Sequence, residues 1–189
     1  MASSINIAPV ILASKKDSRS RASIIVRPGS PHCKRSFRAW ALALGLGAGG
    51  VGIASAVDYC LATKFAAIKL SELNIGIGPF VIGPAVSRKI GMAAFSQLSL
   101  NANEFQTAEW AKEKGMYAEV HESANALDEA VMKLAKYLVG TNPEARRQLK
   151  KVFWEGTDHW DDLLAERAAM SGQLVLSDHT KATLKRYAS

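Results

Sequence analysis

A glycine-rich run followed by a single carboxylate is the feature that most constrains what this chain can fold into. The run covers residues 49–58 and reads Gly49-Gly50-Val51-Gly52-Ile53-Ala54-Ser55-Ala56-Val57-Asp58, and Glu72 follows fourteen residues after Asp58. A glycine pair can begin a helix whose unpaired backbone N–H groups point at an oxyanion. Glu72 then supplies a proton acceptor beside that helix. Together these residues predict acid–base chemistry beside a stabilised oxyanion.

Positive charge is concentrated near the N-terminus. Residues 1–47 hold eight Lys and Arg residues against one acid, Asp17, while residues 48–189 hold sixteen of each sign, so the first segment accounts for the net charge of +7. Nucleic-acid-binding proteins usually place basic residues on a folded face with aromatic or polar readers among them. Here they lie in a Ser/Arg/Pro stretch without periodicity. We therefore expect no nucleic-acid partner.

The charge pattern divides the chain into two parts. We expect residues 1–47 to form a basic, Ser/Arg-rich, disordered tail and residues 48–189 to form the folded domain. An organelle transit peptide, a disordered tail and a mis-started reading frame all remain open as explanations of the tail. Two cysteines, Cys33 and Cys60, form no Cys-x-x-Cys motif, which favours a reducing compartment. We expect a cytoplasmic protein, or a mitochondrial one if the tail is a transit peptide.

An uncharged run raises the question of a membrane span. Ala39 to Val57 is nineteen residues long without a charge, and it contains Gly45-x-x-x-Gly49. Five of these residues are Gly and six are Ala, which contribute little to insertion compared with Leu or Ile. We expect a glycine turn and a buried helix here, with a membrane anchor as the weaker alternative.

Short β-prone runs precede a series of helices. Residues 58–62 and 65–70 are predicted to be buried strands, and the loop residues 74–79 stop the second. Helices are predicted over residues 104–114, closed by Gly115, and over residues 125–139, closed by Gly140. The second helix has an apolar stripe formed by Leu127, Ala130, Val131, Leu134 and Leu138.

Asn142-Pro143 is typical of the start of another helix, for which we expect Leu149, Val152 and Phe153 to face inward. In residues 158–162, Asp-His-Trp-Asp-Asp, adjacent positions on a helix point in different directions. We therefore predict Asp158 as an N-cap and the other two acids as first-turn residues, rather than a metal site. This order, strands first and helices last, predicts an α/β fold.

Several of these segments together resemble the enoyl-CoA hydratase/isomerase (crotonase) superfamily. The resemblance covers residues 48–189 and is carried by four segments in the same order and spacing: Gly49-Gly50-Val51-Gly52-Ile53-Ala54 with Asp58, Ile68-Lys69-Leu70-Ser71-Glu72-Leu73 with Gly76, Ala108-x-x-Ala111 with Gly115, and Leu163-Leu164-Ala165-Glu166-Arg167. The implied fold is the crotonase-type ββα spiral with a helical C-terminal part. Residues 1–47 do not match, and they lack the Ala-Gly-Ala-Asp-type loop of the family's first half, so we expect an N-terminally truncated fold.

The resemblance also implies a function. It implies an acyl-CoA thioester as substrate, no separate cofactor because coenzyme A is part of the substrate, and a homo-oligomer, either a trimer or a hexamer. Gly49 corresponds to an oxyanion donor and Glu72 to the catalytic carboxylate, while Gly50, Gly52 and Gly76 correspond to substrate-binding positions. A non-catalytic subunit that assembles with a full-length homologue is the alternative.

One position departs from the family's hydratases. These enzymes use two glutamates to deliver water across the double bond, and the first of them corresponds to Gly52 in this chain. A single carboxylate can still remove a proton at one carbon and return it two carbons away. The sequence therefore favours isomerase chemistry or weakened hydratase chemistry, and an inactive protein also remains open.

Overall fold

The computed structural model describes residues 10–13 and 49–188. The predictions made for Cys33 and for the first part of the uncharged run lie outside the described residues. So does most of the basic tail, predicted to be disordered, but its residues 10–13 are described and form a strand. Contacts divide the chain into two units. Among the described residues, the first unit contains residues 10–13, 57–67 and 107–157, and the second contains residues 49–56, 68–106 and 158–188.

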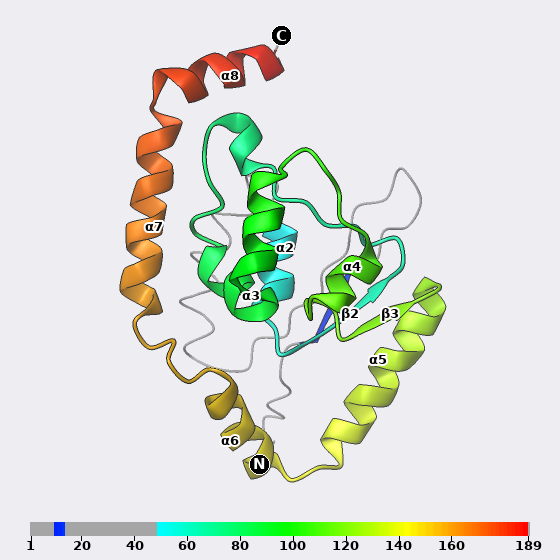
Figure 1. The fold of residues 1–189 in the computed structure, drawn as a ribbon. Coiled ribbons are helices and arrows are strands. Elements are labelled where there is room, and N and C mark those ends of the chain that lie inside the picture. The colour runs from blue at the N-terminus through cyan, green and yellow to red at the C-terminus, as the bar shows by residue number, and fades with distance from the viewer. Residues whose placement is uncertain (1–9, 14–48, 189) are drawn as a thin grey trace. The chain divides into compact units, whose positions relative to one another are not determined.

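The first unit is built on a parallel three-stranded sheet. Its strands are β1 (Val10–Ala13), β2 (Tyr59–Thr63) and β3 (Glu119–His121), in the order β1-β2-β3 (Figure 1). In the register, Leu61 lies opposite Leu12 on one side and Glu119 on the other. The central strand β2 is the predicted strand shifted by one residue. Cys60, Leu61 and Ala62 are fully buried in it, which confirms the expectation of a buried strand.

Two predictions about strands are wrong. Residues 65–70 form no strand and make only an isolated bridge between Ile68 and Gln106. Tight turns replace the start of the predicted strand, because the N–H of Ala66 donates to the Thr63 carbonyl and that of Ala67 to the Phe65 carbonyl. The strands also do not all precede the helices, since β3 follows helix α4 (Ala108–Glu113).

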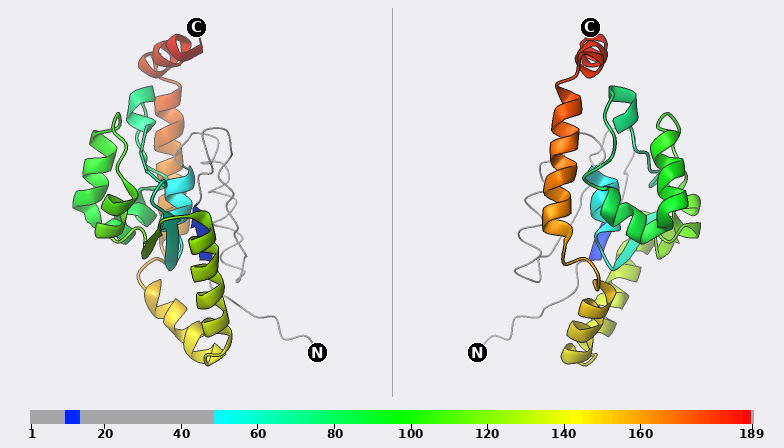
Figure 2. Two further views of the ribbon diagram at one scale, coloured as in Figure 1. Left: turned by 90° about the vertical axis from the view of Figure 1, so that its right-hand side faces the viewer. Right: turned by 60° about the vertical axis from the view of Figure 1, so that its left-hand side comes forward.

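Two helices of the first unit correspond to predicted ones. Helix α4 begins four residues later than predicted, because the Thr107 side chain caps it by accepting a hydrogen bond from the Trp110 N–H, and it is followed by Gly115 at φ 82°. Helix α5 (Ala124–Val139) packs on β2 and β3 (Figure 2). Its predicted apolar stripe is confirmed, with Leu127 buried and the other four residues half-buried.

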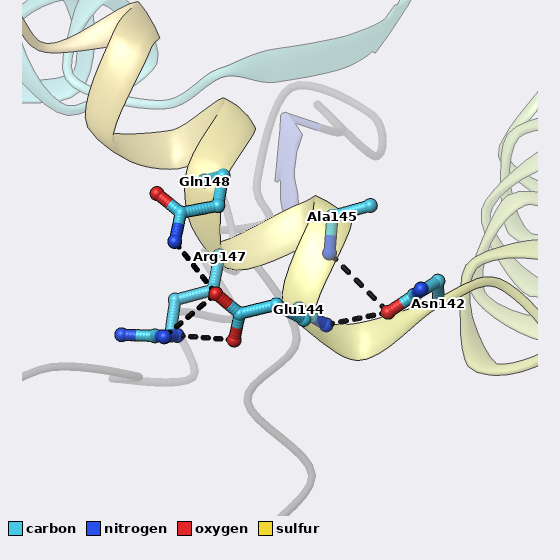
Figure 3. Close-up of polar contacts among 5 residues, drawn as sticks. All are labelled: Asn142, Glu144, Ala145, Arg147 and Gln148. Atoms are coloured by element: carbon cyan, nitrogen blue, oxygen red, sulfur yellow. Dashed lines mark hydrogen bonds and ion pairs between the residues drawn. The ribbon is translucent and has the colours of Figure 1, made fainter.

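Helix α6 (Pro143–Phe153) begins as predicted. The Asn142 side chain accepts hydrogen bonds from the N–H groups of Glu144 and Ala145 (Figure 3). Glu144 also accepts two hydrogen bonds from the Arg147 guanidinium, which lowers the pKa of the Glu144 carboxyl. Both features favour the helix start, because they satisfy free N–H groups and place a negative charge at the positive end of the helix dipole.

The orientation predicted for α6 is wrong. Leu149, Val152 and Phe153 are about half exposed, at 51%, 57% and 47%. A neighbouring side of the helix is anchored instead, since the Lys150 ammonium lies 2.6 Å from Asp58 Oδ2 and Trp154 Nε1 donates to Asp58 Oδ1 at 2.7 Å. Amphipathic spacing identified the apolar side of α6, but a charged hydrogen-bond network decides which side faces its own unit.

The second unit is helical. It contains α2 (Gly49–Ser55), the 3-10 turn η2 (Glu72–Ile75), α3 (Gly83–Leu100), α7 (Trp160–Val175) and α8 (Asp178–Ala188). Sequence analysis did not predict α3, although Pro84 lies in its first turn and its buried residues follow helical spacing: Ala85, Val86, Ile90, Ala94 and Leu98. Gly91 interrupts this helix at φ 78°.

The predicted cap of α7 is also corrected. The residue at the N-cap position is His159 rather than Asp158, and no side chain makes a capping hydrogen bond there. Asp161 and Asp162 lie in the first turn as predicted. Across residues 10–13 and 49–188, none of the helices combines the length and the apolar character needed to cross a membrane.

Candidate functional site

Glu72 is a buried carboxylate at the start of η2. The residue is only 6% exposed, and Leu70, two positions earlier, is completely buried. Its Oε2 atom finds no hydrogen-bond partner among the described residues. Burial raises the pKa of the Glu72 carboxyl, while hydrogen bonds from the backbone N–H groups of Glu72 and Ser71 act in the opposite direction. A buried side chain with an unsatisfied oxygen and a raised pKa is suited to accepting and returning a proton.

The turn that carries Glu72 is fixed by hydrogen bonds at several points. The N–H of Ile77 donates to the Glu72 carbonyl and that of Gly76 to the Leu73 carbonyl, both at 3.1 Å. The Asn74 side chain donates to the Ala102 carbonyl at 3.0 Å. Gly76 ends the turn in the left-handed conformation, at φ 83° and ψ 16°, which favours glycine. The backbone of Glu72 is therefore held independently of its side chain.

The glycines predicted to bind an oxyanion and substrate lie at the start of α2. The helix begins at Gly49, as expected, and its first N–H groups have no acceptor within the helix. Gly52 is buried, whereas Gly50 is exposed, and a Cβ atom added at Gly50 would meet no heavy atom within 4 Å.

The structure brings the predicted site residues to two elements of one unit. Gly49, Gly50 and Gly52 lie on α2. Glu72 is the first residue of η2, and Gly76 is its C-cap. Both elements contact α3, which makes this helix their common support. Sequence analysis missed α3, and Pro84 followed by apolar residues at helical spacing is the signal that could have revealed it.

A groove in the second unit also went unpredicted. It has a volume of about 500 Å³ and lies between α3 and α7, where it is lined mainly by apolar side chains, among them Phe80, Phe95 and Trp160, with Arg88 and Arg167. Within the described part of the chain, no group of three or more His, Cys, Asp or Glu side chains could hold a metal ion.

The effect of Glu72 on stability should depend on pH. The pKa of Glu72 is higher in the folded chain than in the unfolded chain, so at a pH between these two pKa values the folded state binds more protons. The free energy of unfolding therefore falls as the pH rises from the lower pKa to the higher one. Glu72→Gln removes this loss. We expect the variant to melt above the parent at about pH 7.5 and close to it below about pH 4. Thermal unfolding at both pH values tests this, and an equal difference at both would contradict it.

Gly50 allows stability and substrate binding to be separated. Because a methyl group at position 50 meets open space, Gly50→Ala should stabilise the helix by about 0.5–1 kcal/mol. If substrate approaches this backbone, the same methyl group should lower activity by at least about tenfold. Chemical denaturation and enzyme assays on one preparation measure both effects. An unchanged rate would remove Gly50 from the substrate-binding set.

Comparison with known proteins decides the family. The sequence profile described as enoyl-CoA hydratase/isomerase matches residues 45–189. The chain belongs to the enoyl-CoA hydratase/isomerase family. The matched range contains all five predicted site residues. Among curated proteins, none matches the chain significantly.

Solved structures show the crotonase-like α/β fold of this family. An enoyl-CoA hydratase from Mycobacterium avium aligns with a TM-score of 0.66 and 23% identity over 82% of this chain and 66% of that one. An enoyl-CoA hydratase/isomerase from Pseudoalteromonas atlantica T6c aligns with a TM-score of 0.66 and 17% identity over 73% and 56%. For an enoyl-CoA hydratase from Bacillus halodurans, the TM-score is 0.65 and the identity 23%, over 72% and 55%. The chain thus spans about half to two thirds of the length of these relatives.

Proposed function

We propose that this protein acts on an acyl-CoA thioester by proton transfer at the carbon next to the thioester carbonyl. The observation that carries the proposal is the buried Glu72 carboxyl, one oxygen of which has no hydrogen-bond partner among residues 10–13 and 49–188, in a chain of the enoyl-CoA hydratase/isomerase family. Glu72 is the base, and the Gly49 N–H is a donor to the enolate oxygen. Gly50, Gly52 and Gly76 are the positions at which backbone borders substrate. No cofactor is required, because coenzyme A is part of the substrate.

The chemistry we propose is isomerisation of a 3-enoyl thioester to the 2-enoyl form. The Glu72 carboxylate removes a proton from C2, and the electron pair shifts into a dienolate whose negative oxygen accepts a hydrogen bond from Gly49. The same carboxyl then returns the proton to C4, which moves the double bond to C2–C3. Gly52 offers no carboxylate to orient a water molecule, which favours this reaction over hydration.

The exposed apolar side of α6 supports a role in assembly. Leu149 and Val152 are 51% and 57% exposed and lie on the same side of one amphipathic helix. Such surfaces often mark contacts with other chains. We propose a homo-oligomer, a trimer or a hexamer, as the state of the active protein. The second candidate function is a non-catalytic subunit that uses this surface to assemble with a full-length homologue.

Location and domain organisation complete the proposal. We propose that residues 48–189 form the main part of the crotonase-like domain and that the basic segment, residues 1–47, adds strand β1 (Val10–Ala13) to its sheet. The protein is cytoplasmic, or mitochondrial if the tail acts as a transit peptide. Fractionation of cells that express the intact chain distinguishes the two locations, because recovery with mitochondria would show that the basic segment acts as a transit peptide.

Two assays test the proposed activity. The first follows exchange of the α-proton of a saturated acyl-CoA in deuterated water, and the second follows conversion of a 3-enoyl-CoA to the 2-enoyl form. We expect both reactions, each slower in Glu72→Gln. Absence of both in the purified protein would contradict the proposed enzyme and favour the non-catalytic subunit. Hydration of 2-enoyl-CoA faster than isomerisation would contradict the proposed reaction.

A further inference from the structure

Thr180 links the C-terminal helix to the turn that carries Glu72. It lies on α8, is completely buried, and its Oγ1 donates a hydrogen bond to the Gly76 carbonyl at 3.1 Å. Gly76 is the C-cap of η2, whose first residue is Glu72. The hydroxyl group therefore acts on the same backbone turn that carries the candidate base.

The start of α8 holds the Thr180 hydroxyl in place. Ser177 caps this helix, since the Thr180 N–H donates to Ser177 Oγ at 3.3 Å, and the two hydroxyl oxygens lie 3.2 Å apart. The Ser177 hydroxyl donates its one hydrogen to the Leu174 carbonyl at 2.7 Å, while the Thr180 hydroxyl donates to the Gly76 carbonyl. The helix cap thus holds the backbone of Thr180, and the hydrogen bond to Gly76 restrains rotation of its hydroxyl.

Helix α8 lies so close to Gly76 that no side chain larger than that of glycine fits at this position without a shift. A Cβ atom added at Gly76 would lie 2.5 Å from Thr180 Oγ1 and 3.0 Å from Cδ2 of His179. The position of Gly76 is also tied to Glu72 through the turn itself, because the next residue, Ile77, donates its N–H to the Glu72 carbonyl. A shift of α8 away from Gly76 would thus be transmitted to the backbone of Glu72.

We propose that Thr180 is a positioning residue that fixes the Glu72 turn through the Gly76 carbonyl, so that the C-terminal helix sets the place of the catalytic base. This inference rests on the proposed function for its effect on rate. Its structural part, the control of the Glu72 environment by the Thr180 hydroxyl, does not depend on activity. The two parts can therefore be tested separately.

Three variants separate positioning from stability. Thr180→Val keeps the shape and removes the hydroxyl, Thr180→Ser keeps the hydroxyl, and Thr183→Val removes a second buried hydroxyl of α8, which accepts a hydrogen bond from Arg186. We expect Thr180→Val to lower kcat by about ten- to a hundredfold with little change in KM, since small displacements of a reacting group cost rates of this order. Thr180→Ser should restore most of kcat, and Thr183→Val should leave it unchanged.

Titration of the Glu72 carboxyl supplies a readout that needs no activity. The carbon-13 signal of this carboxyl, assigned by its loss in Glu72→Gln, reports the Glu72 pKa directly. In Thr180→Val the loosened turn should admit water to Oε2, so the pKa should fall toward its ordinary value, whereas Thr183→Val should not change it. An identical titration in the parent and Thr180→Val would overturn the inference. A changed titration in a protein without activity would support the inference and contradict the proposed function.

Discussion

Replacement of Glu72 by glutamine is expected to lower the rate of α-proton exchange and of 3-enoyl-CoA isomerisation by about two to four orders of magnitude. Glutamine keeps the shape of the side chain but cannot accept the proton. The loss should appear in kcat rather than in KM, because the carboxylate acts on the reacting carbon. Steady-state kinetics of the parent and the variant measure it.

A second glutamate of the same unit provides the control. Glu104 is exposed and lies outside the turn formed by residues 72–76. Glu104→Gln therefore makes the same chemical change away from the candidate base. We expect its rates to equal those of the parent. If Glu72→Gln retains the parent's activity, Glu72 is not the base, whatever the rate of the control.

Gly76→Ala should be among the most destabilising single substitutions in the second unit. The left-handed conformation costs an alanine about 1–2 kcal/mol, and a methyl group 2.5 Å from the Thr180 oxygen adds an overpacking cost of about 1–3 kcal/mol. We expect a loss of about 2–5 kcal/mol in the free energy of unfolding. Urea denaturation at pH 7 measures this loss.

Gly156→Ala separates the two causes. Gly156 also has a positive φ, 77°, but a Cβ atom there meets nothing within 4 Å. It should show only the backbone cost, about 1–2 kcal/mol. Equal losses at the two glycines would contradict the steric contact between Gly76 and α8.

The family and the crotonase-like fold could be predicted from local signals. The glycine run indicated the start of a helix at Gly49, Asn142-Pro143 indicated the start of α6, and the stripe through Leu127 indicated the inner side of α5. These features depend on residues close together in sequence, where spacing and capping decide the structure. The assignments of Gly49, Gly50, Gly52, Glu72 and Gly76 to catalysis and substrate binding stay predictions.

Other features depend on partners far apart in sequence. Leu149 and Val152 were predicted to face inward from their spacing alone, but Asp58, 92 residues before Lys150, anchors a neighbouring side of α6. The strand predicted over residues 65–70 failed for a different reason, because turn hydrogen bonds near Ala66 compete with β pairing. The contact of Thr180 with Gly76 has no signature in sequence, since a threonine in a short amphipathic helix gives no indication of its acceptor.

The sequence separation between Gly76 and Thr180 bears on when the Glu72 turn can be completed during synthesis. The two residues are 104 positions apart, so the hydrogen bond between them is among the long-range contacts that form late in folding. At translation rates of about 5–20 residues per second, roughly 5–20 s pass between the synthesis of Gly76 and that of Thr180. Throughout this interval, the Glu72 turn lacks the contact that α8 makes with it through Thr180. A nascent chain should therefore complete the packing around the Glu72 turn only after α8 has been made.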